Sequence, residues 1–249
     1  QYVATHVRDH LGPEDIVDDI AGAPDGDDWL DAWRESDSLA ATAADKLLDE
    51  EDWPAGPRLA RDLVRALPAG AALFLGSSNP IRDVDLLAEP RADLTVHANR
   101  GVAGIDGNVS TALGVALTHD GPGYAFVGDL TFLHDANGLA AGPGEARPDL
   151  TIVVHNDDGG GIFSLLEQGA AEHRDGFERV FGTPPGVDIG ALCAGYRVPH
   201  VPVDTPDALA GAVRAGTGVR VVEVRADRGR LRDLHARLRA AVAEAALRP

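Results

Sequence analysis

The sequence predicts an α/β protein with a doubly wound, mostly parallel sheet of about six strands and helices on both faces. Short, continuous apolar runs alternate with segments of helical periodicity, which is typical of parallel strands buried on both sides. Polar and glycine-rich residues follow successive apolar runs, at the positions where such sheets bind ligands. Together these observations predict a binding site at the carboxyl edge of the sheet.

Two helices are expected before the sheet. The first spans residues 28–50, with acids in its first turn and apolar residues near one face: Trp29, Trp33, Ala40, Ala44 and Leu47. The second begins at Pro57, and Pro68 ends it, because proline suits the first turn of a helix but not its continuation.

The expected strands and helices then alternate. Strands are predicted at residues 71–76, 94–99, 124–129, 150–157, 201–204 and 219–226. Helices are predicted after the glycine-rich turn at 101–107, around 131–140, near 191–198 and at 206–216. A last helix at 231–247 has its apolar face formed by Leu231, Leu234, Leu238, Val242 and Ala245.

Composition excludes several classes of function. The net charge of -18 repels nucleic acid and anionic lipid, so neither is an expected partner. No apolar run is long enough to cross a membrane and no secretory signal opens the sequence, so we expect a cytoplasmic protein without membrane insertion. The single cysteine, Cys193, lies in an apolar stretch and is expected to be a buried structural thiol.

The organisation of the chain suggests part of a longer polypeptide. Methionine is absent and the chain begins with Gln1. Residues 1–27 have the pattern of the tail of a preceding central domain with a linker, and residues 28–249 form the predicted α/β domain.

Two acidic turns follow neighbouring predicted strands. Asp129 follows Gly128 in "GDLTFLHDANG", and "NDDGGGIF" begins at Asn156. Taken alone, Asp129 is more often a helix cap than a ligand. However, glycine lets the backbone approach a ligand, a helix start favours a diphosphate, and Mg²⁺ prefers oxygen ligands. The two turns therefore predict a divalent metal carrying a diphosphate.

The chain resembles the thiamine-diphosphate enzymes at these turns. Four motifs in order, "GSSNPIRDVDL", "NRGVAGIDGNVSTALG", "GDLTFLHDANGL" and "NDDGGGIFSLLEQG", resemble the carboxyl-terminal half of the 2-succinyl-5-enolpyruvyl-6-hydroxy-3-cyclohexene-1-carboxylate (SEPHCHC) synthases of menaquinone biosynthesis. This resemblance implies a transferase, a carboligase that uses thiamine diphosphate and Mg²⁺ or Mn²⁺. The implied substrates are 2-oxoglutarate, which is decarboxylated, and isochorismate, which accepts the succinyl unit.

The resemblance also implies the metal ligands. These are Asp129, a second side chain, and a backbone carbonyl two residues beyond it. The "GGGIF" register favours Asp157 with the Gly159 carbonyl, whereas the neutral amide of Asn156 would limit the negative charge around the metal. Both remain candidates at this stage.

Further residues take implied roles in binding. Those assigned to the cofactor are Ser78, Ile105, Gly128, Asp129, Leu130, Thr131 and Asn156, with Ile105 beneath the cofactor, although it could equally be a core residue. Those assigned to the substrates are Arg82 and Arg100, which would bind carboxylates, and Ile162, Phe163 and Leu166. No catalytic residue is assigned, and His134 receives no role.

One catalytic group is expected outside this chain. Thiamine enzymes of this kind use a glutamate on a pyrimidine-binding domain of a second subunit, and no such domain is found in the sequence. We therefore expect a homo-oligomer when full length and little turnover from this chain alone. Three alternatives remain: an acetolactate-synthase-like carboligase or decarboxylase, a non-catalytic assembly module, and a dinucleotide-binding dehydrogenase, which the absence of G-x-G-x-x-G after the first strand disfavours.

Overall fold

The computed structural model describes residues 26–99, 101–102, 104–214 and 216–246. These residues fall into two compact units, one of residues 26–50 with 236–246 and the other of Glu51–His235. The predicted segment 1–27 therefore lies almost wholly outside the described residues. Among the described residues, no helix combines the length and the hydropathy needed to cross a membrane.

The first unit contains the helix predicted at residues 28–50, which extends over α2 (Gly26–Glu50). Ala44 and Leu48 are buried, whereas Trp29 and Trp33 are exposed and lie with their ring centroids 5.9 Å apart. The two tryptophans were expected on an apolar face, and the structure shows that they pair with each other on the surface. The unit also contains the second half of α10 (Leu231–Ala246).

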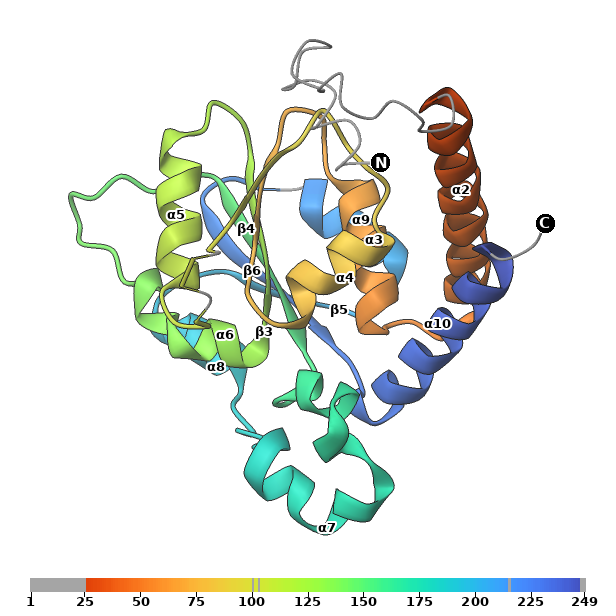
Figure 1. Cartoon of the computed structure of the whole chain (residues 1–249). Helices are drawn as coiled ribbons and strands as arrows, with labels where there is room; N and C mark the ends of the chain where they lie inside the picture. Colours follow the sequence, from red (N-terminus) through yellow and green to blue (C-terminus); the bar gives the residue numbers. More distant parts are fainter. Residues whose placement is uncertain (1–25, 100, 103, 215, 247–249) are drawn as a thin grey trace. The chain divides into compact units, whose positions relative to one another are not determined.

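The second unit is built on a six-stranded, fully parallel sheet (Figure 1). Its strands are β1 (Ala72–Leu75), β2 (Thr95–Ala98), β3 (Gly123–Gly128), β4 (Leu150–Asn156), β5 (His200–Val203) and β6 (Val219–Arg225), in the order β2-β1-β3-β4-β6-β5. The predicted class is thus confirmed, and every strand is parallel to its neighbours. The central strands β1, β3, β4 and β6 are buried almost throughout, as their continuous apolar runs require.

Two layers of helices cover the sheet. One apolar cluster packs α3 (Gly56–Ala66), α4 (Asn79–Leu87) and α9 (Pro206–Arg214) against one face. The other packs α5 (Asn108–Thr118), α6 (Asp129–His134) and α8 (Ile189–Gly195) against the opposite face. Cys193 is buried in the second cluster, as predicted.

Two stretches differ from the prediction. The helix expected around residues 131–140 is two elements, α6 and a 3-10 turn at Ala136–Leu139, because Asp135 leaves the helical conformation and its carboxylate accepts bonds from Ser110. Between β4 and α8, residues 161–182 form a run of short helical turns, including α7 (Arg174–Phe177), drawn in teal at the bottom of Figure 1. We call residues 161–182 the β4–α8 insertion.

Candidate metal and cofactor site

The candidate site lies where the strand order reverses. From β1 the chain runs to the edge strand β2 and returns to β3 on the other side of β1. In such sheets, the loops after the two diverging strands leave a crevice at the carboxyl edge. Ser77 and Ser78 follow β1, Asp129 follows β3, and Asp157 follows β4. The fold thus brings the predicted polar turns to one edge of three adjacent strands.

Asp129 is the most enclosed of these polar groups, with only 2% of its surface exposed. The pKa of Asp129 is raised to about 7, first by burial and then by the charge of Asp157, while the backbone at Leu130 and Gly159 acts to lower it. Its Oδ2 atom has no hydrogen-bond partner among the described residues. A buried carboxylate oxygen of this kind is suited to a cation.

Asp157 is the second buried carboxylate. Burial raises the pKa of Asp157 to about 6, and the guanidinium of Arg228 opposes this rise. Gly161 is needed beside it, because a Cβ atom there would collide with Asp157 Oδ2. Asp129 and Asp157 are close enough for the charge of Asp157 to raise the pKa of Asp129, and they follow strands β3 and β4, which pair side by side.

A third carboxyl group adjoins Asp157. Asp83, in α4, is 2% exposed, and burial followed by the charge of Asp157 raises its pKa to about 8. Its Oδ1 atom lies 3.5 Å from Nε2 of His235. Asp83 could not be identified from the sequence, since an acid in a helix is ordinarily a surface residue and only the packing of α4 buries it.

Asn156 has a different environment from Asp157. Its amide nitrogen donates to Oε1 of Glu223 at 2.6 Å, and its Oδ1 accepts from the backbone N–H of Asp158 at 3.0 Å. Glu223 is buried in β6, so the side chain of Asn156 links β4 to β6 and also stabilises the turn after β4. Of the two predicted candidates, Asp157 is therefore the one that lies with Asp129.

The turn after β4 depends on glycine. Asp158 and Gly159 have φ of 54° and 140°, and the second value is one that side chains rarely adopt. A Cβ atom on Gly159 would collide with the carbonyl oxygen of Gly182, and one on Gly160 with that of Phe181. The amide of Gly160 donates to the Gly182 carbonyl at 2.7 Å. The turn is thus packed directly on the end of the β4–α8 insertion.

The other predicted cofactor residues line the same edge. Gly128 precedes α6, and the space where its Cβ would lie is open, whereas Thr131 is buried and Leu130 is half-buried in α6. Ser78 has a φ of 83°, a strained value for serine, of the kind that concentrates at functional sites. Ile105 is half-buried before α5 and belongs to neither apolar cluster of the described residues.

The predicted substrate residues separate into two groups. Arg82 is exposed on α4, and its Nη1 donates to the carbonyl of Ser78 at 2.6 Å, so it lies at the rim. Arg100 lies outside the described residues. Ile162, Phe163 and Leu166 lie on the first turn of the insertion, and Phe163 is 38% exposed.

Aromatic contacts support this first turn. The ring of Phe163 lies against Phe181, with centroids 5.8 Å apart, and Phe181 is 6.2 Å from Phe177. The sequence analysis did not identify Phe181, although the spacing of the phenylalanines in "FERVF" was a possible signal. Phe163 therefore belongs to an aromatic group that only the folding of the insertion assembles.

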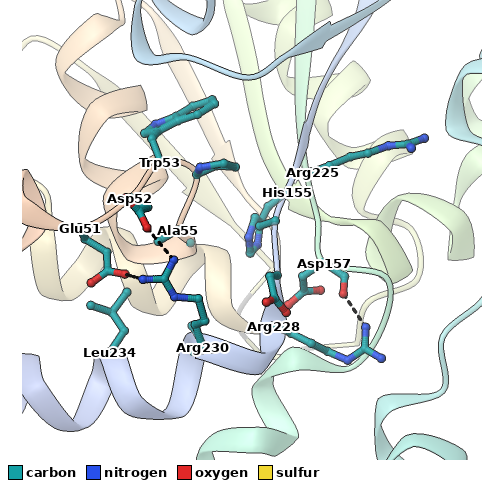
Figure 2. Close-up of a pocket in the computed structure, with 15 residues that line it drawn as sticks. Glu51, Asp52, Trp53, Ala55, His155, Asp157, Arg225, Arg228, Arg230 and Leu234 are labelled. Carbon is teal, nitrogen blue, oxygen red and sulfur yellow. Dashed lines mark hydrogen bonds and ion pairs between the residues drawn. The ribbon is translucent and has the colours of Figure 1, made fainter.

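A cavity of about 320 Å³ has Asp157 in its lining (Figure 2). Its walls come from residues 51–56, the end of β4, and residues 225–234. His155 lines it and is 5% exposed, and burial lowers the pKa of His155 to about 4, so the imidazole is neutral at physiological pH. Arg230 also lines the cavity, and its guanidinium pairs with the carboxylates of Glu51 and Asp52 (Figure 2).

The residues fit a metal–diphosphate group better than a metal held by protein alone. Across the described part of the chain, no cluster of three or more His, Cys, Asp or Glu side chains has the arrangement of a metal site. Two carboxylates and a backbone carbonyl leave several positions around Mg²⁺ to a phosphate and water, which is the usual coordination of this ion. The unpartnered Oδ2 of Asp129 and the open space at Gly128 agree with such a group.

The fold and this site define a thiamine-dependent class of enzyme. Residues 86–225 match the family described as thiamine pyrophosphate enzyme, C-terminal TPP binding domain, and the chain belongs to that family. The predicted resemblance is confirmed by curated relatives. The chain is 63% identical over 219 residues to the 2-succinyl-5-enolpyruvyl-6-hydroxy-3-cyclohexene-1-carboxylate synthase of Saccharopolyspora erythraea, covering 88% of this chain and 39% of the relative.

Other relatives carry the same name. The synthase of Nocardia farcinica is 53% identical over 217 residues, covering 87% of this chain and 40% of the relative. That of a Nocardioides species is 47% identical over 245 residues, covering 96% and 45%. The chain thus spans about two fifths of the length of the curated relatives it matches.

Solved structures agree on the fold. A thiamin diphosphate-dependent enzyme from Mycobacterium smegmatis aligns with a TM-score of 0.50 at 21% identity, covering 68% of this chain and 31% of that structure. Benzoylformate decarboxylase from Polynucleobacter necessarius aligns with a TM-score of 0.52 at 20% identity, covering 69% and 33%. At these identities the similarity concerns the fold alone.

Proposed function

We propose that this chain is the diphosphate-binding part of a cytoplasmic SEPHCHC synthase, a thiamine-diphosphate- and Mg²⁺-dependent carboligase of menaquinone biosynthesis. Its reaction would be the decarboxylation of 2-oxoglutarate and the addition of the succinyl unit to isochorismate. The observation that carries the proposal is the meeting of Asp129 and Asp157, two buried carboxylates from adjacent strand ends. The identity of 63% to a named synthase supports the choice of reaction.

The metal would be held by Asp129, Asp157 and the carbonyl of Gly159. Both carboxyl groups have a raised pKa in the ligand-free chain, so binding Mg²⁺ would release their protons. The turn geometry supports the third ligand, because the positive φ of Gly159 reverses the backbone immediately after Asp157. Magnesium would then neutralise two charges that are costly to bury side by side.

The cofactor diphosphate would lie against Gly128, Leu130 and Thr131, with Ser78 as a further contact. Open space at Gly128 would allow close approach to the backbone. Ile105 would lie beneath the cofactor. When bound, thiamine diphosphate supplies the electron sink needed to break the bond to the departing carboxylate.

The substrates would be oriented at the rim of the site. Arg82 and Arg100 would bind carboxylates of 2-oxoglutarate and isochorismate, since guanidinium groups match carboxylates with two parallel hydrogen bonds. The bond from Arg82 to the Ser78 carbonyl uses one of its five donors and holds the group at the rim. Ile162, Phe163 and Leu166 would exclude water from the reacting carbon.

The proposal includes a second subunit. We infer that a pyrimidine-binding domain from another copy supplies the activating glutamate, which makes the functional protein a homo-oligomer. The chain alone would bind metal and cofactor but turn over slowly.

A reconstitution experiment tests the proposal. The chain would be mixed with the amino-terminal part of the Saccharopolyspora erythraea relative, and the release of carbon dioxide from 2-oxoglutarate would be followed with and without isochorismate, thiamine diphosphate and Mg²⁺. Dependence on all three additions is expected. Turnover of pyruvate in place of 2-oxoglutarate would indicate an acetolactate-synthase-like enzyme. Failure to bind thiamine diphosphate with Mg²⁺ would indicate a non-catalytic module.

A further inference from the structure

Two arginines one helical turn apart contact the β4–α8 insertion from the same side. Arg228 begins the 3-10 turn that follows β6, and Arg232 lies in the first turn of α10. Residues at i and i+4 project from one face of a helical segment, so both guanidinium groups reach the same neighbour. Residue 230, between them, faces elsewhere and pairs with Glu51 and Asp52.

Arg228 joins the turn after β4 to the far end of the insertion. Its Nη1 donates to the carbonyl oxygens of Asp157 and Asp158, each at 2.6 Å, and its Nη2 pairs with the carboxylate of Glu178. The contact with Asp157 is drawn in Figure 2. The side chain is only 16% exposed, which strengthens these charge-assisted bonds. One guanidinium therefore holds the backbone of the proposed metal ligand and the insertion at once.

Arg232 holds the near end of the insertion. Its Nη1 donates to the carbonyls of Ser164 and Leu166, each at 2.7 Å. Leu166 is itself a proposed substrate contact, and Ser164 directly follows another, Phe163. The hydroxyl of Ser164 in turn donates to the Gly161 carbonyl at 2.7 Å, which fixes the first turn internally.

The position of the arginines is set by the sheet. β6 pairs with β4 up to Arg225 and Asn156, and the amide of Ala226 donates to the Asn156 carbonyl at 2.8 Å. The chain after β6 therefore leaves the sheet directly beside the turn after β4. The 3-10 turn after β6 carries Arg228 and the first turn of α10 carries Arg232, whereas the insertion they contact consists of short turns.

We propose that Arg228 and Arg232 are positioning residues, with separate tasks. Arg228 would set the backbone that presents Asp157 and Gly159 to the metal, and Arg232 would set the wall formed by Phe163 and Leu166. These two tasks rest on the proposed function. The role of the two arginines in holding the insertion in place does not depend on it. Lysine cannot replace Arg228 fully, because a single ammonium cannot span two carbonyls and a carboxylate as the planar guanidinium does.

Trypsin digestion of the full chain tests the holding of the insertion without any cofactor. Arg174 and Arg179 are exposed cleavage sites within the insertion, and the buried Arg220 in β6 reports global unfolding. In Arg228→Met and Arg232→Met, cleavage after Arg174 and Arg179 is expected to accelerate relative to cleavage after Arg220. The matched control Arg230→Met removes the same charge and should keep the ratio of the unsubstituted chain. An unchanged ratio in both test variants would overturn the proposal.

Ligand titrations and kinetics of the reconstituted enzyme separate the two tasks. Arg228→Met should weaken Mg²⁺ affinity by about tenfold or more, as loss of a residue that orients a ligand typically does. Arg232→Met should leave Mg²⁺ affinity unchanged and raise KM for a substrate. Arg228→Lys should recover part of the loss, because the charge is kept. Equal effects of both variants on Mg²⁺ affinity and KM would contradict the separation of tasks. If the unsubstituted chain does not bind thiamine diphosphate, the proposed function fails. The digestion experiment still decides whether the arginines hold the insertion.

Discussion

The backbone of Gly159, in the turn after β4, lies beside the carboxylate of Asp129 at the end of β3 and lowers the pKa of that carboxyl group. The two residues are thirty positions apart in sequence but lie together because β3 and β4 are adjacent parallel strands. The same contact places Asp157, two residues before Gly159, against Asp129. Five predictions follow from this relationship and from the groups around it.

Removing either buried charge should abolish the response to ligands and, at the same time, raise the stability of the ligand-free chain. Asp129→Asn and Asp157→Asn are expected to lose the rise in Tm that thiamine diphosphate with Mg²⁺ produces. Without ligands at about pH 8, each variant should be more stable by on the order of 1–2 kcal/mol, because a buried carboxylate with a raised pKa opposes folding when ionised. Denaturation with and without ligands measures both effects, with the exposed Asp120→Asn as control. A retained response to ligands in both variants would exclude the proposed metal site.

The stability gain of Asp129→Asn should depend on pH in a defined direction. The pKa of Asp129 rises from 3.8 to about 7 on folding, so the folded chain binds more protons than the unfolded chain between these values. The stabilisation by the protonated group is complete at low pH and is lost as the pH rises through about 7. The difference in unfolding free energy between variant and parent should therefore increase from about pH 5 to pH 8. A difference that shrinks over this range would contradict the assignment.

Mg²⁺ affinity should rise over the same pH range, because the metal binds only the ionised carboxylates. Calorimetric titration in two buffers of different ionisation enthalpy would measure the protons released. No release at pH 6 would mean that Asp129 and Asp157 are already ionised or do not bind the metal, since their pKa values are about 7 and about 6.

Asn156 should matter for stability and little for the metal. Asn156→Ala removes one of two donors to Oε1 of the buried Glu223, and Arg225 keeps the other at 2.9 Å. The change should cost about 1–3 kcal/mol, the usual loss for a hydrogen bond to a charged group. The response of Tm to Mg²⁺ and thiamine diphosphate should persist, in contrast to Asp157→Asn. The opposite result, normal stability with a lost metal response, would identify Asn156 as the ligand.

Gly128→Ala tests the approach of the diphosphate to the backbone. A Cβ atom at this position meets no other atom, and its φ of -78° suits alanine, so the ligand-free chain should keep its Tm. The added methyl group would occupy the space proposed for the diphosphate and should weaken thiamine diphosphate binding. Gly144→Ala, in equally open space, serves as the control. Unchanged cofactor affinity in Gly128→Ala would place the diphosphate elsewhere.

The strands of the central sheet could be predicted from sequence because burial on both faces demands continuous apolar runs. The run at 124–129 became β3 (Gly123–Gly128) and that at 150–157 became β4 (Leu150–Asn156), each within one residue or so. The insertion could not be predicted, because its turns lack a period and depend on Arg228 and Arg232 from another part of the chain. The exposure of Trp29 and Trp33 could not be predicted either, since helical spacing places the two rings together but does not reveal whether their face is covered.

Sequence alone determined the alternation of strands and helices, because it follows from local periodicity. It also fixed the order of the four motifs, and their resemblance to a known enzyme family indicated the class of site. Tertiary structure decided which of the polar side chains lie close to one another. It directed Asn156 towards Glu223 and Asp157 towards Asp129, and it buried Asp83 beside them. The physical reason is that the pairing of adjacent strands and the packing of α4 set which neighbouring side chains share a low-dielectric space, and no local pattern in the sequence records that arrangement.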